Sequence, residues 1–249
     1  MKVVCARQRR LPQTAPTPGV VRPAGGRKPH PTRRDWPRVR VIVNAAMSLD
    51  GKIALSGGGR LRLSDEVDWA RVHQLRASVD AVAVGIGTVL ADDPRLTARP
   101  RDADAPSPQP WRVVFDSHGR LPASARVLAP DDRALIVTTS RVTKSWPRAT
   151  TLAVGAGERV DLPAALAQLA AAHGIKSLMV EGGATLIGAL LAANLVDELR
   201  VYVAPLVVGG GAPTLADGPG ATGPGEVLRL RLLGCAAQGE GALLSYGRL

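Results

Sequence analysis

Apolar and polar positions along the chain change between a strand-like and a helix-like spacing. The runs at 39–46, 81–85 and 113–116 are short, apolar and rich in β-branched residues, which indicates strands buried on both faces. Between the first two runs, large side chains recur every three or four residues, so we expect a helix with Ser64 as its N-cap. The expected core face of this helix consists of Trp69, Val72, Leu75, Arg76 and Val79.

The middle of the chain repeats this alternation. Apolar runs at 134–139 and 176–180 predict two more buried strands. An alanine-rich segment between them predicts a helix that is capped by Asp161 and ends at Gly174. A further apolar segment predicts a helix over 185–193. Strands that alternate with helices in this way are typical of parallel pairing.

The last third of the chain has a different character. Strand patterns at 198–204, 227–237 and 242–246 follow one another without intervening helices, and a Gly-Glu-Gly turn at 239–241 separates the last two. The complete order therefore predicts one α/β domain over 39–249, with a mixed sheet flanked by helices and a C-terminal β-hairpin.

The basic residues are concentrated at the N-terminus. Residues 1–40 carry eleven basic groups and one acid, a net charge of +10, so the rest of the chain carries only +1. Residues 1–38 also hold seven prolines and no periodic apolar run, which predicts a disordered basic Pro/Arg-rich tail. Binding of nucleic acid or of a partner through this tail is the alternative to an enzymatic function. The rest of the chain is nearly neutral, which argues against a nucleic-acid surface on the folded part.

Metal-binding and membrane-spanning patterns are not found in the sequence. Cys5 and Cys235 form no CxxC motif, and the four histidines form no HxxxH or HExxH spacing, so we expect no metal site. No apolar run approaches the roughly 20 residues that span a bilayer, so we expect no membrane segment. Without a secretory signal, a cytoplasmic location is the default expectation.

Two glycine pairs lie at strand-to-helix junctions. They are Gly85-Ile-Gly87-Thr88, where Thr88 could cap a short helix, and Glu181-Gly-Gly183-Ala-Thr185. Free backbone N–H groups at such junctions can hold a phosphate, although a glycine pair also serves a tight turn. A Rossmann domain is disfavoured because Leu90 occupies the position of the third glycine.

Four charged residues could form a site, and each has a second interpretation. Arg76 and Arg99 could grip a phosphate if they converge, or they could be a surface ion pair and a solvated side chain. Asp50 in an Asp-Gly turn is consistent with turn chemistry alone. Glu181 lies at the end of an expected buried strand, where a carboxylate either pairs with another polar group for structural reasons or belongs to a functional site.

Six collinear segments resemble the NADPH-dependent reductases of riboflavin biosynthesis. They are residues 44–52, 71–77, 84–97, 180–186, 195–198 and 202–205. Each motif is weak alone, but six in order over about residues 40 to 247 are specific. The resemblance implies a dihydrofolate-reductase-like fold, NADPH as cofactor with NADH also open, and a homodimer.

The resemblance also implies a reaction on a small molecule with a 5′-phosphate. Relatives reduce the ribosylamino group of a pyrimidinone 5′-phosphate to ribitylamino. The HxE and PCxxC ligands of the zinc deaminase fused to bacterial members are absent here, and Asn44 stands where bacterial enzymes commonly carry lysine. The implied substrate is 2,5-diamino-6-ribosylamino-4(3H)-pyrimidinone 5′-phosphate. The deaminated 5-amino-6-ribosylamino-uracil 5′-phosphate and a diverged pteridine reductase are the open alternatives.

The resemblance finally implies roles for individual residues. The implied substrate contacts are Asn44, Arg76, Leu96, Arg99 and Glu181, with the two arginines on the 5′-phosphate. The implied cofactor contacts are Ala46, Thr88, Asp92, Asp116, Ser117, Gly182, Gly183, Ala184, Thr185, Pro205 and Leu206. Water, Asp50 and Glu181 are all candidates for proton transfer. Where relatives often carry a substrate-contacting serine, residues 57–62 read Gly-Gly-Gly-Arg-Leu-Arg, so that contact shifts to Arg60 or Arg62 or is lost.

Overall fold

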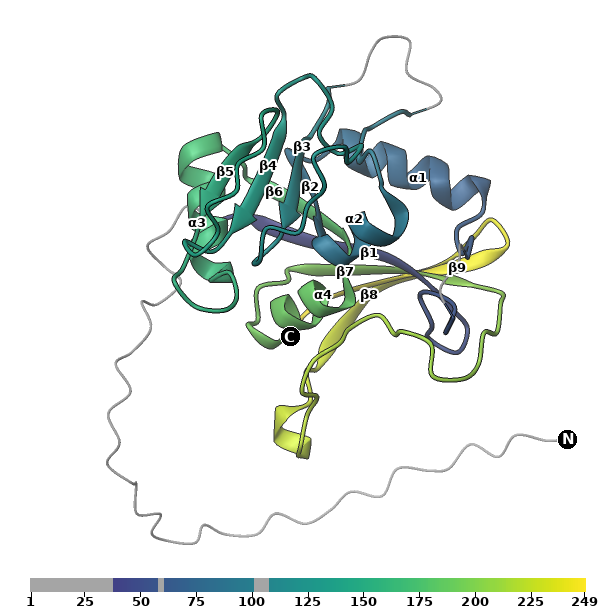
Figure 1. Cartoon of the computed structure of the whole chain (residues 1–249). Helices are drawn as coiled ribbons and strands as arrows, with labels where there is room; N and C mark the ends of the chain where they lie inside the picture. The colour runs from purple at the N-terminus through teal and green to yellow at the C-terminus, as the bar shows by residue number, and fades with distance from the viewer. Residues whose placement is uncertain (1–37, 58–60, 101–107) are drawn as a thin grey trace, which may run out of the picture. The chain divides into compact units, whose positions relative to one another are not determined.

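The computed structural model describes residues 38–57, 61–100 and 108–249 (Figure 1). The expected tail therefore lies outside the described residues, apart from Arg38, which forms an ion pair with Asp197. The elements in chain order are β1 (Arg40–Ser48), α1 (Glu66–Ala77), β2 (Ala81–Gly85), α2 (Ile86–Asp92), β3 (Trp111–Phe115), β4 (Ala134–Thr138), β5 (Thr150–Ala153), α3 (Leu162–His173), β6 (Ser177–Gly182), α4 (Ala184–Ala192), β7 (Glu198–Ala204), η1 (Pro224–Glu226), β8 (Leu230–Gln238) and β9 (Gly241–Arg248).

All nine of these strands form one sheet in the order β5-β4-β3-β2-β6-β1-β7-β9-β8. The seven strands from β5 to β7 are parallel to their neighbours, whereas β9 runs antiparallel to both β7 and β8. The expected mixed sheet with a C-terminal hairpin is confirmed. Insertion of β6 between β2 and β1 reverses the strand order, and ligands of open α/β sheets bind at the carboxyl ends of strands beside such a reversal.

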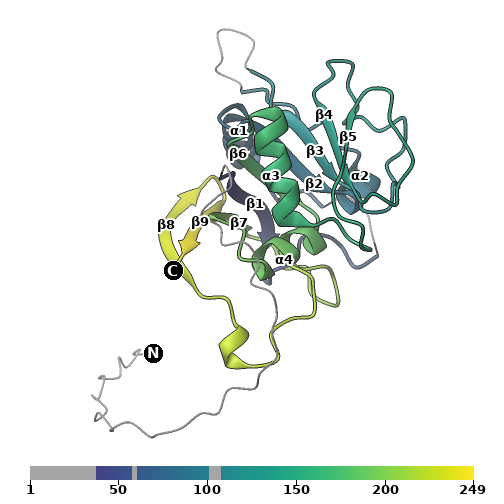
Figure 2. The same cartoon turned by 90° about the vertical axis from the view of Figure 1, so that its left-hand side faces the viewer.

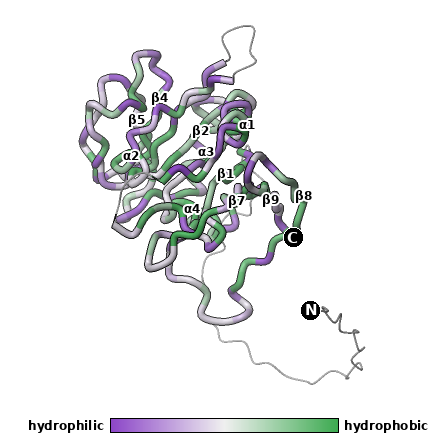
Figure 3. The backbone as a smooth tube through the Cα atoms, turned by 90° about the vertical axis from the view of Figure 1, so that its right-hand side faces the viewer, coloured by the Kyte–Doolittle hydropathy of each residue, from purple (hydrophilic) through white to green (hydrophobic). Residues whose placement is uncertain are grey.

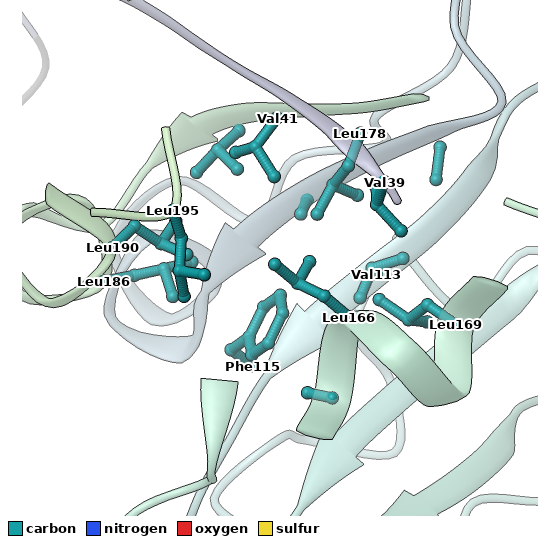
Figure 4. Packing of buried hydrophobic residues seen from close by; sticks show 14 of the residues in the cluster. Val39, Val41, Val113, Phe115, Leu166, Leu169, Leu178, Leu186, Leu190 and Leu195 are labelled. Carbon is teal, nitrogen blue, oxygen red and sulfur yellow. The ribbon is translucent and has the colours of Figure 1, made fainter. Parts of the chain in front are cut away.

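Alternate residues of the parallel strands pack on opposite faces of the sheet. Val41 and Val43 of β1 belong to the core beneath α3 and α4, whereas Ile42 belongs to the core beneath α1 and α2. Figure 2 shows α3 and α4 on one face, and Figure 4 shows Leu166 of α3 close to Phe115 of β3. Period-two burial on both faces explains why these strands are continuous apolar runs.

Helix α1 begins one residue later than expected. Its N-cap is Asp65, whose carboxylate accepts from the backbone N–H of Asp68 at 2.7 Å, so Ser64 is not the cap. Asp65 also accepts from the Tyr202 hydroxyl at 2.9 Å, a tertiary contact that no local pattern reveals. Trp69 was expected in the core but is 43% exposed.

Two further expectations are wrong in detail. Thr88 lies inside α2, whose N-cap is Gly85, because the helix starts directly after β2. Strand β5 was not expected: its four residues, Thr-Thr-Leu-Ala, lie at the sheet edge, the outer two exposed and the inner two half-buried, and they form no long apolar run. The ends of β2 and β7 and the Asp161 cap of α3 agree with expectation.

Strand β8 forms the other edge of the sheet and is largely exposed. Leu232 is 54% exposed and Leu233 is 51% exposed, and Cys235 follows them in the same strand. The tube is coloured as hydrophobic along part of β8 (Figure 3). This edge contrasts with the parallel strands at the centre of the sheet, whose side chains are buried on both faces.

Candidate active site

Two polar side chains lie side by side near the carboxyl end of β6 and beside the middle of β1. Val43 and Val180 are register partners in this parallel pair, so Asn44 and Glu181 follow them on the face covered by α1. Asn44 is buried, and Glu181 is half-buried near the end of β6. Buried polar groups at this point of the sheet need partners, and α1 supplies them.

Arg76 of α1 forms a bidentate ion pair with Glu181. Its Nε donates to Oε1 at 2.6 Å and its Nη2 donates to Oε2 at 2.5 Å, while Nη1 donates to the Thr97 carbonyl at 3.1 Å. The side chain of Arg76 is only 7% exposed, so the pair is shielded from screening by solvent. All three guanidinium nitrogens therefore have protein acceptors, which the sequence did not reveal.

His73 joins this group one helical turn before Arg76. Its Nδ1 accepts from the backbone N–H of Arg99 at 3.1 Å, and its ring lies edge-on to Trp69. Burial, together with the positive charges of Arg76 and Arg99, lowers the pKa of His73, while Glu181 raises it. Both arginines thus lie within electrostatic reach of one imidazole.

His73 was missed as a site residue because a lone histidine on an amphipathic helix resembles a core residue. The available signal was its spacing from Arg76, three residues along one helix face.

The segment from 93 to 99 is held in an unusual backbone conformation. Leu96 has φ of 54°, and the residue as a whole is only 1% exposed, so neither its side chain nor its backbone faces solvent. The side-chain amide of Gln109 accepts from the Ala98 N–H at 3.1 Å and donates to its carbonyl at 2.8 Å. With His73 on the Arg99 N–H, these bonds fix the backbone and leave the Arg99 side chain exposed.

Glycines allow the ends of β2 and β6 to approach closely. A Cβ on Gly183, whose φ is 93°, would lie 3.1 Å from the backbone of Gly85, and a Cβ on Gly182 would lie 2.8 Å from Thr88 Oγ1. Helix α4 starts after Gly183 without a side-chain cap, so the first N–H groups, including those of Ala184 and Thr185, have no capping side chain.

The remaining implied cofactor contacts lie in different surroundings. Asp116 is buried: Oδ2 accepts from the Leu121 N–H at 2.8 Å, and Oδ1 has no hydrogen-bond partner in the described part of the chain. The Ser117 hydroxyl accepts from the Val160 N–H at 3.1 Å. Asp92 is exposed at the end of α2.

Three further implied contacts lie near the end of β1 and after β7. Ala46 of β1 is half-buried, and Pro205 and Leu206, directly after β7, are exposed. The Leu206 carbonyl accepts from the Leu49 N–H at 2.7 Å, which ties the two loops together.

Asp50 organises a loop. Its carboxylate accepts from the Ser48 hydroxyl at 2.6 Å and from the backbone N–H groups of Val208 and Gly209 at 3.0 and 2.7 Å. These bonds lower the pKa of Asp50 to about 2, with the Ser48 bond as the largest cause. A group that is ionised at neutral pH and fully engaged in this way is a poor proton donor, so the tentative catalytic role of Asp50 is not favoured.

The described residues contain neither a cluster of potential metal ligands nor a helix that could span a membrane. No group of three or more His, Cys, Asp or Glu side chains is clustered there to hold a metal ion. None of the helices between residues 38 and 249 that the structure describes is long and apolar enough to cross a bilayer.

Of the two arginines to which the substrate contact of residues 57–62 could shift, Arg62 pairs with Glu66 at the start of α1. Arg60 lies outside the described residues.

Comparison with known proteins places the sequence among the reductases of riboflavin biosynthesis. The RibD C-terminal domain model matches residues 39–244. A protein of Archaeoglobus fulgidus named 2,5-diamino-6-ribosylamino-4(3H)-pyrimidinone 5′-phosphate reductase is 46% identical over 193 residues, which are 73% of this chain and 87% of that relative. A protein of Methanothermobacter thermautotrophicus with the same name is 45% identical over 215 residues, 84% of this chain and 98% of that relative.

Solved structures show the same fold. RibD of Acinetobacter baumannii superposes with a TM-score of 0.76 at 27% identity, covering 86% of this chain and 59% of that longer chain. The Saccharomyces cerevisiae riboflavin biosynthesis reductase Rib7 superposes with a TM-score of 0.67 at 20% identity, covering 86% of this chain and 91% of that one, and bears on the fold alone. The resemblance in the sequence is confirmed, because the family model and the archaeal relatives cover most of the chain: it belongs to the RibD C-terminal domain family.

Proposed function

We propose that this protein is an NADPH-dependent reductase of 2,5-diamino-6-ribosylamino-4(3H)-pyrimidinone 5′-phosphate that forms the ribitylamino product. The observation that carries the proposal is the cluster of Arg76, Glu181, His73 and Arg99 at the carboxyl ends of the strands. It lies beside the uncapped start of α4, in a chain that matches the archaeal reductases over most of their length.

The residues beside β2 and β6 fit a dinucleotide. Close approach of Gly85 and Gly183 keeps side chains away from the start of α4, where N–H groups and the helix dipole favour a pyrophosphate. Asp116 Oδ1 is a buried acceptor without a partner in the described residues, and it suits a hydroxyl of the cofactor. We infer that NADPH is used, and NADH remains the competing reductant for the assay to compare.

The substrate phosphate is assigned to the exposed guanidinium of Arg99. Its backbone is fixed by His73 and by the bonds of Gln109 to Ala98, so the side chain starts from an ordered position. Arg76 contributes positive charge nearby, but its nitrogens are held by Glu181 and the Thr97 carbonyl. Of the two arginines, Arg99 therefore makes the direct phosphate contact and Arg76 chiefly orients Glu181.

Glu181 is assigned to the sugar. Each of its oxygens accepts one bond from Arg76 and keeps a further acceptor position, which suits a hydroxyl of the opened ribose. When bound, NADPH supplies a hydride to C1′ of the imine that forms after ring opening. By holding the sugar chain, Glu181 presents C1′ in a reactive geometry, which is the main contribution a protein makes to such a transfer. Solvent, rather than Asp50, supplies the accompanying proton.

The assay that tests this function follows nicotinamide absorbance. Purified protein is mixed with NADPH or NADH and with either the diaminopyrimidinone or the deaminated uracil 5′-phosphate. We expect NADPH oxidation with the diaminopyrimidinone to be the fastest of the four combinations. Faster reduction of the uracil would overturn the substrate assignment, and oxidation with neither compound would overturn the reductase assignment.

We also propose that the protein is a homodimer. The apolar side chains exposed along β8, including Leu232 and Leu233, form an edge that an isolated protomer leaves in water. Pairing with a second copy along this edge would cover them. Light scattering of the full chain should give twice the chain mass of 25.9 kDa, and Leu232→Arg should give the monomer mass. A wild-type monomer would contradict the dimer without affecting the reductase assignment.

A further inference from the structure

Helix α1 presents two arginines to two polar side chains on adjacent strands. Arg76 pairs with Glu181 of β6, and Arg71 bonds to Asn44 of β1. The residues that precede Asn44 and Glu181 are register partners, so these two side chains are neighbours on the face beneath α1. The proposed function uses Arg76 and Glu181, the resemblance implies a substrate contact for Asn44, and neither gives Arg71 a role.

Arg71 is fixed by a buried carboxylate of its own helix. Its Nε donates to Asp68 Oδ1 at 2.8 Å, and its Nη1 donates to Asn44 Oδ1 at the same distance. Asp68 is 1% exposed, and its backbone N–H donates to the capping carboxylate of Asp65. Moving the guanidinium away from Asp68 would leave a buried carboxylate unpaired, which is strongly unfavourable. Arg71 therefore stays where it is.

This contact determines which way the Asn44 amide points. A guanidinium has donors only, so the Asn44 atom that faces Arg71 must be the carbonyl oxygen. Turning the amide by half a rotation would place its NH₂ group against a donor. In residues 38–57, 61–100 and 108–249, Asn44 Nδ2 has no hydrogen-bond partner, and it is not among the orphan polar atoms sealed from solvent there. The NH₂ end is thus the end available to a ligand.

The two candidate substrates differ on the edge of the ring that carries C2. In the diaminopyrimidinone, the amino group on C2 is a donor and the adjacent N1 is an acceptor. In the deaminated compound, the C2 oxygen is an acceptor and N1 carries a hydrogen. A freely turning carboxamide can match either order, because rotation exchanges its donor and its acceptor. A carboxamide held in one orientation matches only one.

We propose that Arg71 is a specificity-determining residue that selects the diaminopyrimidinone by holding the Asn44 amide in one orientation. The Asn44 NH₂ group donates to ring N1 of that compound, and the same group would face the N1–H donor of the deaminated compound. Two donors in contact leave both without an acceptor, and such a mismatch discriminates more strongly than a missing methyl group. Arg71 acts through Asn44, so it is a positioning residue. This inference rests on the proposed function and on the substrate contact that the resemblance implies for Asn44.

The test compares kcat/KM for the two pyrimidine phosphates in designed variants. Asp68→Asn combined with Arg71→Gln removes both charges, so that neither is left alone in the interior. We expect the preference for the diaminopyrimidinone to fall by about tenfold or more, because a wrongly oriented hydrogen bond is worth about that factor. The matched control, Arg141→Gln, removes an arginine from an exposed ion pair with Glu158 and should leave the preference unchanged.

An unchanged preference in the double variant would overturn the inference, as would a wild-type protein that uses both compounds equally well. An equal loss of rate with both compounds would also overturn the inference, because a purely structural role of Arg71 lowers both rates together. If circular dichroism shows that the double variant does not fold, Asp68→Leu combined with Arg71→Met removes both charges and leaves no buried polar group unpaired. The same fall in preference is expected for this variant, measured as calorimetric affinities for the two pyrimidines, and an unchanged preference would overturn the inference. A wild-type protein that oxidises NADPH with neither pyrimidine would contradict the proposed function itself, which is a separate result.

Discussion

Two arginine–carboxylate pairs in this molecule have nearly the same chemistry. In each, two guanidinium nitrogens bind one carboxylate and the third donates to a backbone carbonyl: Arg76 with Glu181, and Arg112 with Asp131. Both arginines are buried, and the Arg112 side chain is fully inaccessible to solvent. Pair geometry alone therefore does not distinguish a site from a structural contact.

The surroundings of the two pairs differ. Glu181 lies near the carboxyl end of β6, close to His73, to Arg99 and to the glycine junction. Asp131 precedes β4 at the opposite end of the strands. Its interaction with Arg112 ties the start of β3 to the loop that joins β3 to β4. These polar neighbours are the reason that we propose a functional role for the first pair, and isosteric variants of both pairs can test that difference.

The largest effect is expected for Glu181→Gln. The substitution keeps the shape of the side chain but removes the charge that binds Arg76 and weakens the acceptor assigned to the sugar. We expect kcat/KM to fall by about 100-fold, the usual scale for removing one group that orients the reacting centre. Steady-state kinetics measure this, with Asp131→Asn as the matched control. Equal activity of the two variants would erase the distinction between the pairs.

A somewhat smaller effect is expected for Arg99→Ala. Loss of the guanidinium should raise KM for the 5′-phosphate substrate by about 30-fold with little change in kcat, since a charge-assisted bond contributes about 2 kcal/mol. The dephosphorylated substrate serves as control, because wild type and variant should handle it alike. If its KM rose as much as that of the phosphate ester, Arg99 would not be the phosphate ligand.

The converse experiment concerns stability. Asp131→Asn should lower the free energy of unfolding by about 2 kcal/mol, because Arg112 stays buried and loses its counter-charge. Turnover of the folded enzyme should not change. Urea unfolding followed by circular dichroism gives the first quantity and kinetics at low denaturant the second. A stable but inactive Asp131→Asn protein would show that the remote pair also serves catalysis.

A pH effect of modest size is expected from His73. Its pKa is lowered in the folded protein, chiefly by burial, so the unfolded chain binds a proton more readily than the native state. The contribution of neutral His73 to stability is complete above its ordinary value of 6.5 and is lost as the pH falls through the lowered pKa. His73→Gln should flatten that part of the stability profile, whereas His118→Gln should not. The same slope in both variants would contradict this assignment.

The smallest effect on chemistry is expected for Asp50→Asn. The amide can still accept one of the loop N–H bonds, so kcat/KM should change by no more than about threefold and its pH profile should keep its shape. A proton donor would instead cost about 100-fold or more on removal. A large fall in kcat for this variant would return Asp50 to the list of catalytic groups.

The fold was largely predictable because its determinants are local. A continuous apolar run marked the ends of β2, a strand pattern rich in apolar residues marked those of β7, and Asp161 with Gly174 marked both ends of α3. The errors have tertiary causes. Asp65 caps α1 while it also accepts from Tyr202, and β5 is a short edge strand whose pairing with β4 outweighs its weak pattern.

For the proposed site, the sequence supplied candidate residues but not the contacts among them. The motif match named Arg76, Arg99 and Glu181 as substrate contacts, but no spacing shows that Arg76 binds Glu181 or that His73 lies between the arginines. Those contacts depend on β6 entering the sheet beside β1, a long-range arrangement. Arg71 was missed for the same reason, since its partner Asn44 is 27 residues away in sequence.

The central claim is that hydride passes from NADPH to C1′ of the diaminopyrimidinone sugar, and an isotope transfer experiment tests it most directly. NADPH carrying deuterium on the transferable position of nicotinamide C4 is incubated with the full-length protein and the substrate. Mass spectrometry and NMR of the product should locate one deuterium on C1′ of the ribityl chain. A product without deuterium, or with deuterium at any other carbon, would contradict the account.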